Sequence, residues 1–211
     1  MGHIAGKDVY RRLGKKIDGH QVRTPWNNSF YEILKELYTP EEAEILVGMP
    51  YGMSGMEEIA KTTKCEENKL NNILGSLSSK GLVMDMWING QYYYTPSPMV
   101  VGIFEMTMMR TGPGLNTKKW AKLFHDYMSG DDRFYAANFG HGEKVSIMRT
   151  LPHEETIDQT DHVEVLDYEK ATSIVENAGK FAIGICSCRH EKLHVGEKSC
   201  DVPLEKCSSF D

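Results

Sequence analysis

Residues 54–98 read SGMEEIAKTTKCEENKLNNILGSLSSKGLVMDMWINGQYYYTPSP, and this stretch decides the fold that the sequence predicts. Apolar residues recur at helical spacing in two of its segments, MEEIAKTT and NKLNNILGSLSSKGL. Ser54 is placed to cap the first helix, and Gly81 is placed to end the second. The stretch therefore begins with two short amphipathic helices.

The second part of the stretch predicts a β-hairpin. LVMDMWI and QYYYT are rich in residues that favour strands, and the Asn89-Gly90 pair between them is typical of a tight turn. A further helix, PEEAEILVGM, precedes the stretch, with Thr39 as its N-cap and Pro40 in its first turn. Helices followed by a hairpin in this order make the winged-helix arrangement.

The remaining segments extend this organisation on both sides. VYRRLGKKID, NSFYEILKELY, MVVGIFEMTMMR, NTKKWAKLFHDYM and DYEKATSIVENAG predict helices, whereas KVSIMRTL predicts a strand and FAIGIC a short buried strand. We therefore expect an α+β protein in three parts. These are a winged-helix-like domain over 1–103, a helical bridge with a strand over 104–150, and a small carboxy-terminal α/β domain over 151–211.

Composition and charge exclude several classes of protein. A chain of 211 residues with 40% hydrophobic residues is long enough for one large or two small buried cores. No apolar run reaches the roughly eighteen residues of a membrane helix, and the amino end lacks the apolar core of a secretory signal. The net charge of −6 argues against a protein that mainly coats nucleic acid. We expect a cytoplasmic protein with no membrane partner.

The cysteines are the most informative residues for function. Cys186, Cys188, Cys200 and Cys207 fall within the last 26 positions, in the pattern C-x-C, eleven residues that begin with Arg189, C, six residues, C. Thiols persist in a reducing compartment, where such a group more often binds a metal than forms disulfides. We expect the four side chains to converge from a strand and the loop that follows it. The fifth, Cys65, is expected to be a small, partly buried residue.

The four cysteines are compatible with two kinds of metal centre and with one interpretation that involves no metal. A tetrahedral zinc site is usually built from cysteine pairs two to four residues apart, and the second pair here is wider. An iron–sulfur cluster spreads its four iron corners over a larger body and tolerates irregular spacing, so the pattern favours a [4Fe–4S] cluster. Structural or unrelated thiols are the third interpretation.

Three neighbouring residues bear on the same site. The Arg189 guanidinium beside Cys188 supplies positive charge and several donors that could reach cluster sulfurs. We therefore place it with the cofactor-binding residues, with a solvated arginine as the alternative. His190 and His194 could replace a thiol in a mixed zinc site, although we expect both to be polar loop residues.

The segment CSCRHEKLHVGEKSCDVPLEKC resembles the cysteine segment of a family of 4Fe–4S ferredoxin-type iron–sulfur proteins of anaerobes. Members carry a winged-helix-like amino-terminal region, a C-x-C-R…C…P-x-x-x-C segment and usually a carboxy-terminal ferredoxin domain. TPEEAEIL, SSKGLV, YYYTPSPMVVGIFE and VSIMRTLP resemble the same family. The resemblance implies that the four cysteines ligate a [4Fe–4S] cluster. No ferredoxin C-x2-C-x2-C-x3-C follows in this sequence, so we expect a fragment or a shortened relative.

Charge patterns decide between the candidate functions. The second helix of the winged-helix pattern opens with Glu66 and Glu67, and residues 83–95 carry no Lys or Arg, so nucleic-acid binding is not expected. No phosphate loop, dinucleotide fingerprint or nucleophile elbow indicates an enzyme. We expect an electron-transfer or redox module that docks to a redox partner through the acidic segment 151–180 or the basic segment 7–23. The alternatives are a cluster-sensing transcription regulator and a zinc-stapled structural or interaction domain.

Overall fold

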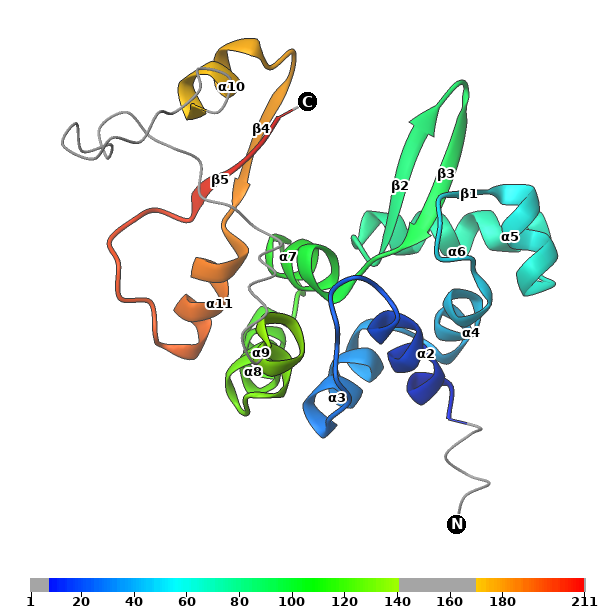
Figure 1. Cartoon of the computed structure of the whole chain (residues 1–211), viewed down its shortest axis with the longest axis horizontal. Helices are drawn as coiled ribbons and strands as arrows, with labels where there is room; N and C mark the ends of the chain where they lie inside the picture. Colours follow the sequence, from blue (N-terminus) through cyan, green and yellow to red (C-terminus); the bar gives the residue numbers. More distant parts are fainter. Residues whose placement is uncertain (1–7, 141–169, 211) are drawn as a thin grey trace.

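The computed structural model describes residues 8–140 and 170–210, which form a mixture of helices and small antiparallel sheets, an α+β architecture. The helices of the amino half and a projecting hairpin lie on one side, and the carboxy-terminal elements lie on the other (Figure 1). The amino half contains, in order, α2 (Val9–Asp18), α3 (Asn28–Leu37), α4 (Pro40–Gly48), β1 (Ser54–Gly55), α5 (Met56–Thr63), α6 (Glu67–Ser79), β2 (Val83–Ile88) and β3 (Gln91–Pro96).

The start of α4 follows the sequence signals closely. The Thr39 hydroxyl accepts the N–H of Glu42 at 3.2 Å, and the Glu42 carboxylate accepts the N–H of Thr39 at 2.8 Å. This reciprocal pair is a capping box, and Pro40 occupies the first turn, where its missing N–H costs nothing. The cap of α5 was wrongly predicted, because Gly55 is the N-cap and the Ser54 hydroxyl donates to the Gly52 carbonyl instead.

The end of α6 explains the glycine at position 81. The N–H of Leu82 donates to the Leu77 carbonyl at 2.9 Å, and that of Gly81 donates to the Ser78 carbonyl at 2.9 Å, as in a Schellman motif. Gly81 has a φ of 71°, and a Cβ there would lie 2.1 Å from the Cβ of Met106. Position 81 therefore requires glycine for two reasons: the backbone has a positive φ, and Met106 leaves no room for a side chain.

The predicted hairpin is present and forms most of a three-stranded sheet. β2 and β3 pair antiparallel, with Trp87 opposite Tyr92, and β1 adds to the other edge of β3 to give the order β1-β3-β2. Asn89 and Gly90 both have positive φ, as a two-residue turn of the mirror-image type needs. The tip is apolar and exposed, since Trp87 retains 63% of its accessible surface.

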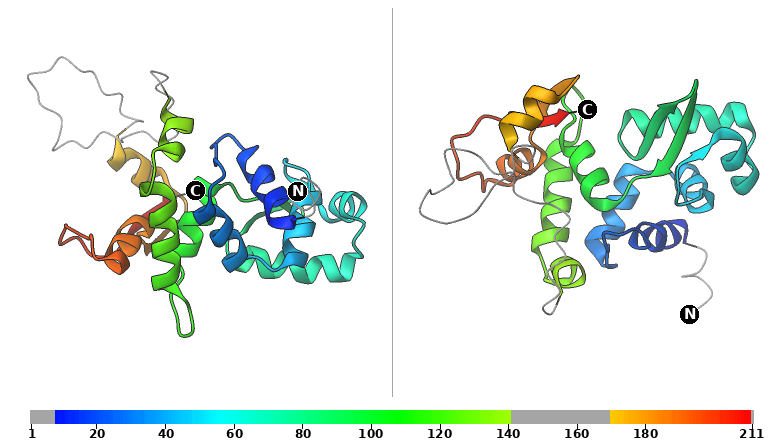
Figure 2. Two further views of the ribbon diagram at one scale, coloured as in Figure 1. Left: turned by 90° about the horizontal axis from the view of Figure 1, so that it is seen from below. Right: turned by 45° about the horizontal axis from the view of Figure 1, so that its top comes forward.

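The next elements carry the chain across the centre of the molecule, as the rotated views in Figure 2 show. They are η1 (Met99–Ile103), α7 (Phe104–Met108), α8 (Thr117–Ser129) and α9 (Arg133–Phe139). The expected helix over MVVGIFEMTMMR is only half correct, because backbone angles at positions 100–102 are not helical. The predicted helix NTKKWAKLFHDYM matches α8 and packs against α3. The predicted strand KVSIMRTL lies outside the described residues.

One hydrophobic core serves the amino half and the bridge. It joins the inner faces of α2, α3 and α4 to α5, α6, α7 and α8, and the wholly buried Phe30, Leu34, Leu70 and Leu74 belong to it. Tyr127 on α8 is also buried, and its hydroxyl donates to the Pro25 carbonyl at 3.1 Å. The half-buried Cys65 packs against this core, as predicted.

The carboxy-terminal elements are α10 (Ala171–Asn177), β4 (Phe181–Ile185), α11 (Ser187–Val195) and β5 (Glu205–Phe210). β4 and β5 form a two-stranded antiparallel sheet, and α11 packs on α7 and α8. The prediction of a buried strand over FAIGIC was wrong in one respect. Phe181 and Ile183 are 71% and 66% exposed, because no further layer among the described residues covers this hairpin. The loop expected after Cys186 was also wrong, since α11 begins there.

Candidate metal centre

Cys186 occupies the junction between β4 and α11. Its N–H donates to the Leu204 carbonyl at 2.7 Å, which continues the β4–β5 pairing by one bond. Its carbonyl accepts the N–H of His190 at 2.9 Å, which is the first hydrogen bond of α11. Cys186 is thus the N-cap of α11 with an extended backbone, and its side chain lies where the sheet and the helix meet.

Arg189 lies between two of the four predicted ligands. Its Nη1 donates to the Sγ of Cys186 at 3.4 Å. The guanidinium also hydrogen-bonds Cys200, and this bond, followed by the Cys186 bond, raises the pKa of Arg189. In return, the Arg189 bond and a backbone bond from Val202 lower the pKa of the exposed Cys200 thiol. One positive charge therefore stabilises the thiolate form of Cys200 and lies beside the Cys186 sulfur.

Cys207 and Cys188 occupy different surroundings. Cys207 lies on β5 directly opposite Gly184 on β4 and is half-buried. Cys188 lies in the first turn of α11, and its sulfur is 3.9 Å from the Ser187 hydroxyl. Although Cys188 is exposed as a residue, it also lines a cavity, and the loss of solvent around its thiol raises the pKa of that thiol. The surroundings of these two thiols therefore differ from those of Cys186 and Cys200 beside Arg189.

The four cysteines fit an iron–sulfur cluster by donor chemistry rather than as a preformed cage. All are free thiols on one short unit, with a guanidinium among them. The described residues contain no group of three or more His, Cys, Asp or Glu side chains arranged to hold a metal ion. The fit therefore rests on the type of the four ligands and on the placement of Arg189.

The cavity beside Cys188 has a volume of about 240 Å³ and is mainly apolar. Aromatic side chains of α7 and α9, including Phe104 and Phe134, form much of its wall, and Glu105 and Glu191 line it as well. Burial raises the pKa of Glu105, against the effect of the Gly102 N–H, which donates to its carboxylate at 2.8 Å. No sequence pattern indicated this cavity, because its walls come from distant segments.

A charged network holds α11 to α8 and was also missed. Glu191, which is only 3% exposed, accepts a hydrogen bond from Nδ1 of His125 at 3.0 Å. Lys192 pairs with Glu197 at 2.8 Å and approaches Nδ1 of His125 at 3.3 Å. Only the helical spacing of CRHEKLH could have indicated this face, and that segment was expected to be a loop.

His190 and His194 lie on the same helix, so the prediction that they are loop residues was wrong. His190 is 8% exposed, and its Nδ1 is 2.6 Å from the Met108 carbonyl on α7. His194, one turn further along, brings its Nε2 to 3.1 Å from the Nε2 of His190. Neither side chain is arranged with the cysteines in a mixed metal group within the described residues.

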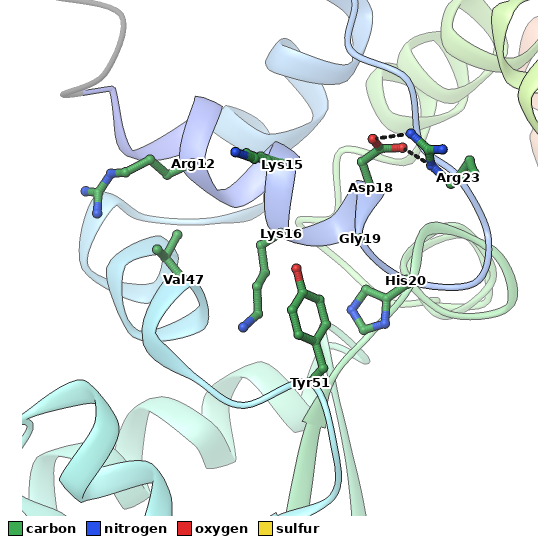
Figure 3. A pocket seen from close by; sticks show the side chains of 9 residues that line it. All are labelled: Arg12, Lys15, Lys16, Asp18, Gly19, His20, Arg23, Val47 and Tyr51. Carbon is green, nitrogen blue, oxygen red and sulfur yellow. Dashed lines mark hydrogen bonds and ion pairs between the residues drawn. The ribbon is translucent and has the colours of Figure 1, made fainter.

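The basic segment 7–23 forms one wall of a cavity of about 660 Å³ at the end of α2 (Figure 3). Arg23 pairs with Asp18 in two hydrogen bonds, of 3.0 and 2.8 Å. Lys16 points toward Tyr51, with its Nζ 4.0 Å from the ring centroid, and burial lowers the pKa of Lys16. Much of the predicted charge is therefore already engaged within the protein. The acidic segment 151–180 lies outside the described residues up to position 169.

Comparison with known proteins adds no relative: no family model, no curated protein and no solved structure matches this chain. Among the described residues, none of the helices has the length and apolar character needed to cross a membrane.

Proposed function

We propose that the carboxy-terminal unit, residues 170–210, binds a [4Fe–4S] cluster through Cys186, Cys188, Cys200 and Cys207. We further propose that the protein is a cytoplasmic electron-transfer module that docks to a redox partner. One observation carries this proposal. Four of the five cysteines lie on a unit whose buried residues, Ser187, His190 and Glu191, are all polar or charged. Such a unit needs a stabilising element other than an apolar core.

The energetic argument begins with the β4–β5 hairpin. An isolated two-stranded hairpin is marginal in water, and small units without a sufficient core are usually held by disulfides or metals. The five cysteines are free, so disulfides do not hold this one. A cluster would have its ligands at the end of β4, at the start of α11, in the loop that follows α11 and on β5. It would therefore tie β4, α11 and β5 together.

The electrostatic argument concerns the negative charge of a cluster with four thiolates. Arg189 already donates to Cys186 and interacts with Cys200, so it would offset that charge. The first turn of α11 presents free backbone N–H groups and the positive end of the helix dipole beside Cys186 and Cys188. The bound cluster would supply one-electron redox chemistry, while these residues would hold it and tune its charge.

The amino half fits a winged-helix-like module that packs and docks rather than reads DNA. α5, α6 and the β2–β3 hairpin follow one another in the order of that arrangement. α6 follows Glu66 and begins at Glu67, while the hairpin exposes Met86 and Trp87 and carries no basic side chain. Phosphate neutralisation provides most non-specific DNA affinity, and this surface offers little of it. This observation disfavours the transcription-regulator alternative.

Anaerobic reconstitution with iron and sulfide tests the cluster directly. We expect about four iron and four sulfide per chain, a brown protein, and an electron paramagnetic resonance signal after reduction. Cys200→Ser should lose most of the iron, because the exposed loop ligand is removed without disturbing the core. Cys65→Ser is the matched control and should keep it. A colourless, iron-free product that binds zinc stoichiometrically would replace this proposal with the zinc-stapled domain.

A further inference from the structure

The histidine pair on α11 has a fixed arrangement of protons. A backbone carbonyl can only accept, so the contact of 2.6 Å between Nδ1 of His190 and the Met108 carbonyl places a proton on Nδ1. Neutral His190 therefore carries its free lone pair on Nε2. That nitrogen faces Nε2 of His194 at 3.1 Å. Without a metal ion this contact is a hydrogen bond that the Nε2–H of His194 donates, and an ion bound between the two nitrogens would take the place of that proton, which moves to Nδ1 of His194.

We infer that His190 and His194 form a two-imidazole site for a divalent transition-metal ion, separate from the four thiols. The site belongs to the class of ions that imidazole suits, such as nickel, copper and zinc. It does not depend on the proposed cluster, because no cysteine takes part in it. The described residues offer no third ligand of the usual types, so the protein supplies two positions and solvent the others.

The spacing of the two nitrogens matches the bite of one metal ion. Metal–imidazole bonds are about 2.0–2.1 Å long. Two such bonds at angles between 90° and 109° separate their nitrogens by about 2.9–3.4 Å. The observed Nε2–Nε2 distance of 3.1 Å lies inside that interval, so an ion could bind without a large rearrangement of either ring.

The surroundings make one ligand rigid and leave the other accessible. His190 is buried where α11 packs against α7, and its bond to the Met108 carbonyl fixes the ring as a second-shell partner does in metal sites. His194 is half-buried and lines a cavity of about 640 Å³ between α8 and α11, through which an ion can enter. Lys118, Lys119 and Lys122 also line this cavity and oppose a bound cation. Asp126 and Glu197 favour one, although they are paired with Lys122 and Lys192.

Nickel titration followed by histidine ring NMR tests this inference on the full chain. The titration is performed on the cluster-loaded protein and on protein whose thiols have been alkylated. The cysteines cannot bind nickel in either form, because the cluster occupies them in the first and alkylation blocks them in the second. If no cluster forms, the titration of the alkylated protein still tests the histidine site. We expect one nickel ion per chain and selective paramagnetic broadening of two histidine ring signals, those of His190 and His194.

Two variants decide whether the pair acts as a chelate. His194→Asn should weaken nickel binding by about tenfold or more, since a single imidazole cannot chelate. His20→Asn, at the end of α2 and away from α11, is the matched control and should stay within about twofold of the parent. Unchanged affinity in His194→Asn, earlier broadening of other histidines, or no binding below about 1 mM in either protein form would overturn the inference.

Discussion

The amino half and the carboxy-terminal unit are stabilised in different ways. In the amino half, Phe30, Leu34, Leu70 and Leu74 are wholly buried in one core. In residues 170–209, no apolar side chain is buried, and Phe181 at the start of β4 keeps 71% of its surface accessible. Burial of a large apolar side chain contributes about 1.5–3 kcal/mol, so the amino half has a large source of stability that the other unit lacks.

The described part of the carboxy-terminal unit depends on polar contacts rather than on an apolar core. Its attachment to the bridge uses buried polar contacts, chiefly Glu191 with His125 and His190 with the Met108 carbonyl. Polar contacts of this kind specify a geometry but give little net free energy, because each replaces contacts with water. Within the part of the chain that the structure describes, the β4–β5 hairpin has neither apolar cover nor such contacts in quantity. A bound cluster would therefore matter far more to this unit than to the rest.

The largest expected effect is loss of the carboxy-terminal structure when the cluster is removed. Oxidation and chelation of the loaded protein should lower amide protection in β4 and β5 by about a thousandfold or more, because the described residues hold the hairpin by no disulfide and no apolar core. Protection in α6 and α8 should change little. Hydrogen exchange read by mass spectrometry before and after removal measures both. Equal protection of β4 and β5 in the two states would show that the hairpin holds itself together.

The second effect probes the core of the amino half. Leu74→Ala should lower the free energy of unfolding by about 3–4 kcal/mol, since the side chain is wholly buried and leaves a cavity. Ile183→Ala, at a position 66% exposed on β4, should change it by less than about 0.5 kcal/mol. Urea unfolding followed by circular dichroism measures the two variants. Similar losses in both would contradict the contrast between the regions.

The amino half was predictable because its signals are local. Thr39 and Pro40 begin α4, Gly81 follows the end of α6, and Asn89-Gly90 turns the hairpin, each through geometry that a few neighbouring residues determine. The core then follows from the apolar faces of the helices. The error at Ser54 arose because the pairing of β1 with β3 competes with helix capping.

The carboxy-terminal unit was less predictable because its order comes from long-range contacts. The short helix α11 carries little apolar periodicity, and the apolar run FAIGI was taken as buried, although β5 is the one strand among the described residues that pairs with β4. β5 itself was not predicted. The Glu191–His125 contact joins residues 66 positions apart, which no sequence pattern indicates. The four cysteines and Arg189 stay a predicted site, chosen by residue type and spacing, and the distances among them could be known only from the fold.

Glu42 links α4 to the end of α6. Substitutions there should have smaller effects on stability, and they distinguish the contribution of the Glu42 charge from that of its capping hydrogen bond. Burial acts to raise the pKa of this carboxyl, but hydrogen bonds from Lys80 and Thr39 outweigh it and hold the pKa below its ordinary value of 4.5. Because the folded pKa is the lower one, the stabilisation is complete above pH 4.5 and is lost as the pH falls through the folded pKa.

Glu42→Gln keeps the capping acceptor but loses the 2.9 Å ion pair with Lys80, so it should lower the free energy of unfolding by about 1 kcal/mol at pH 7. Glu42→Ala loses both and should cost about 2 kcal/mol. The free energy of unfolding, measured from pH 7 to pH 3, should differ less between the parent and Glu42→Gln as the pH falls. A difference that does not change with pH would mean that the shape of the Glu42 side chain, rather than its charge, stabilises the protein.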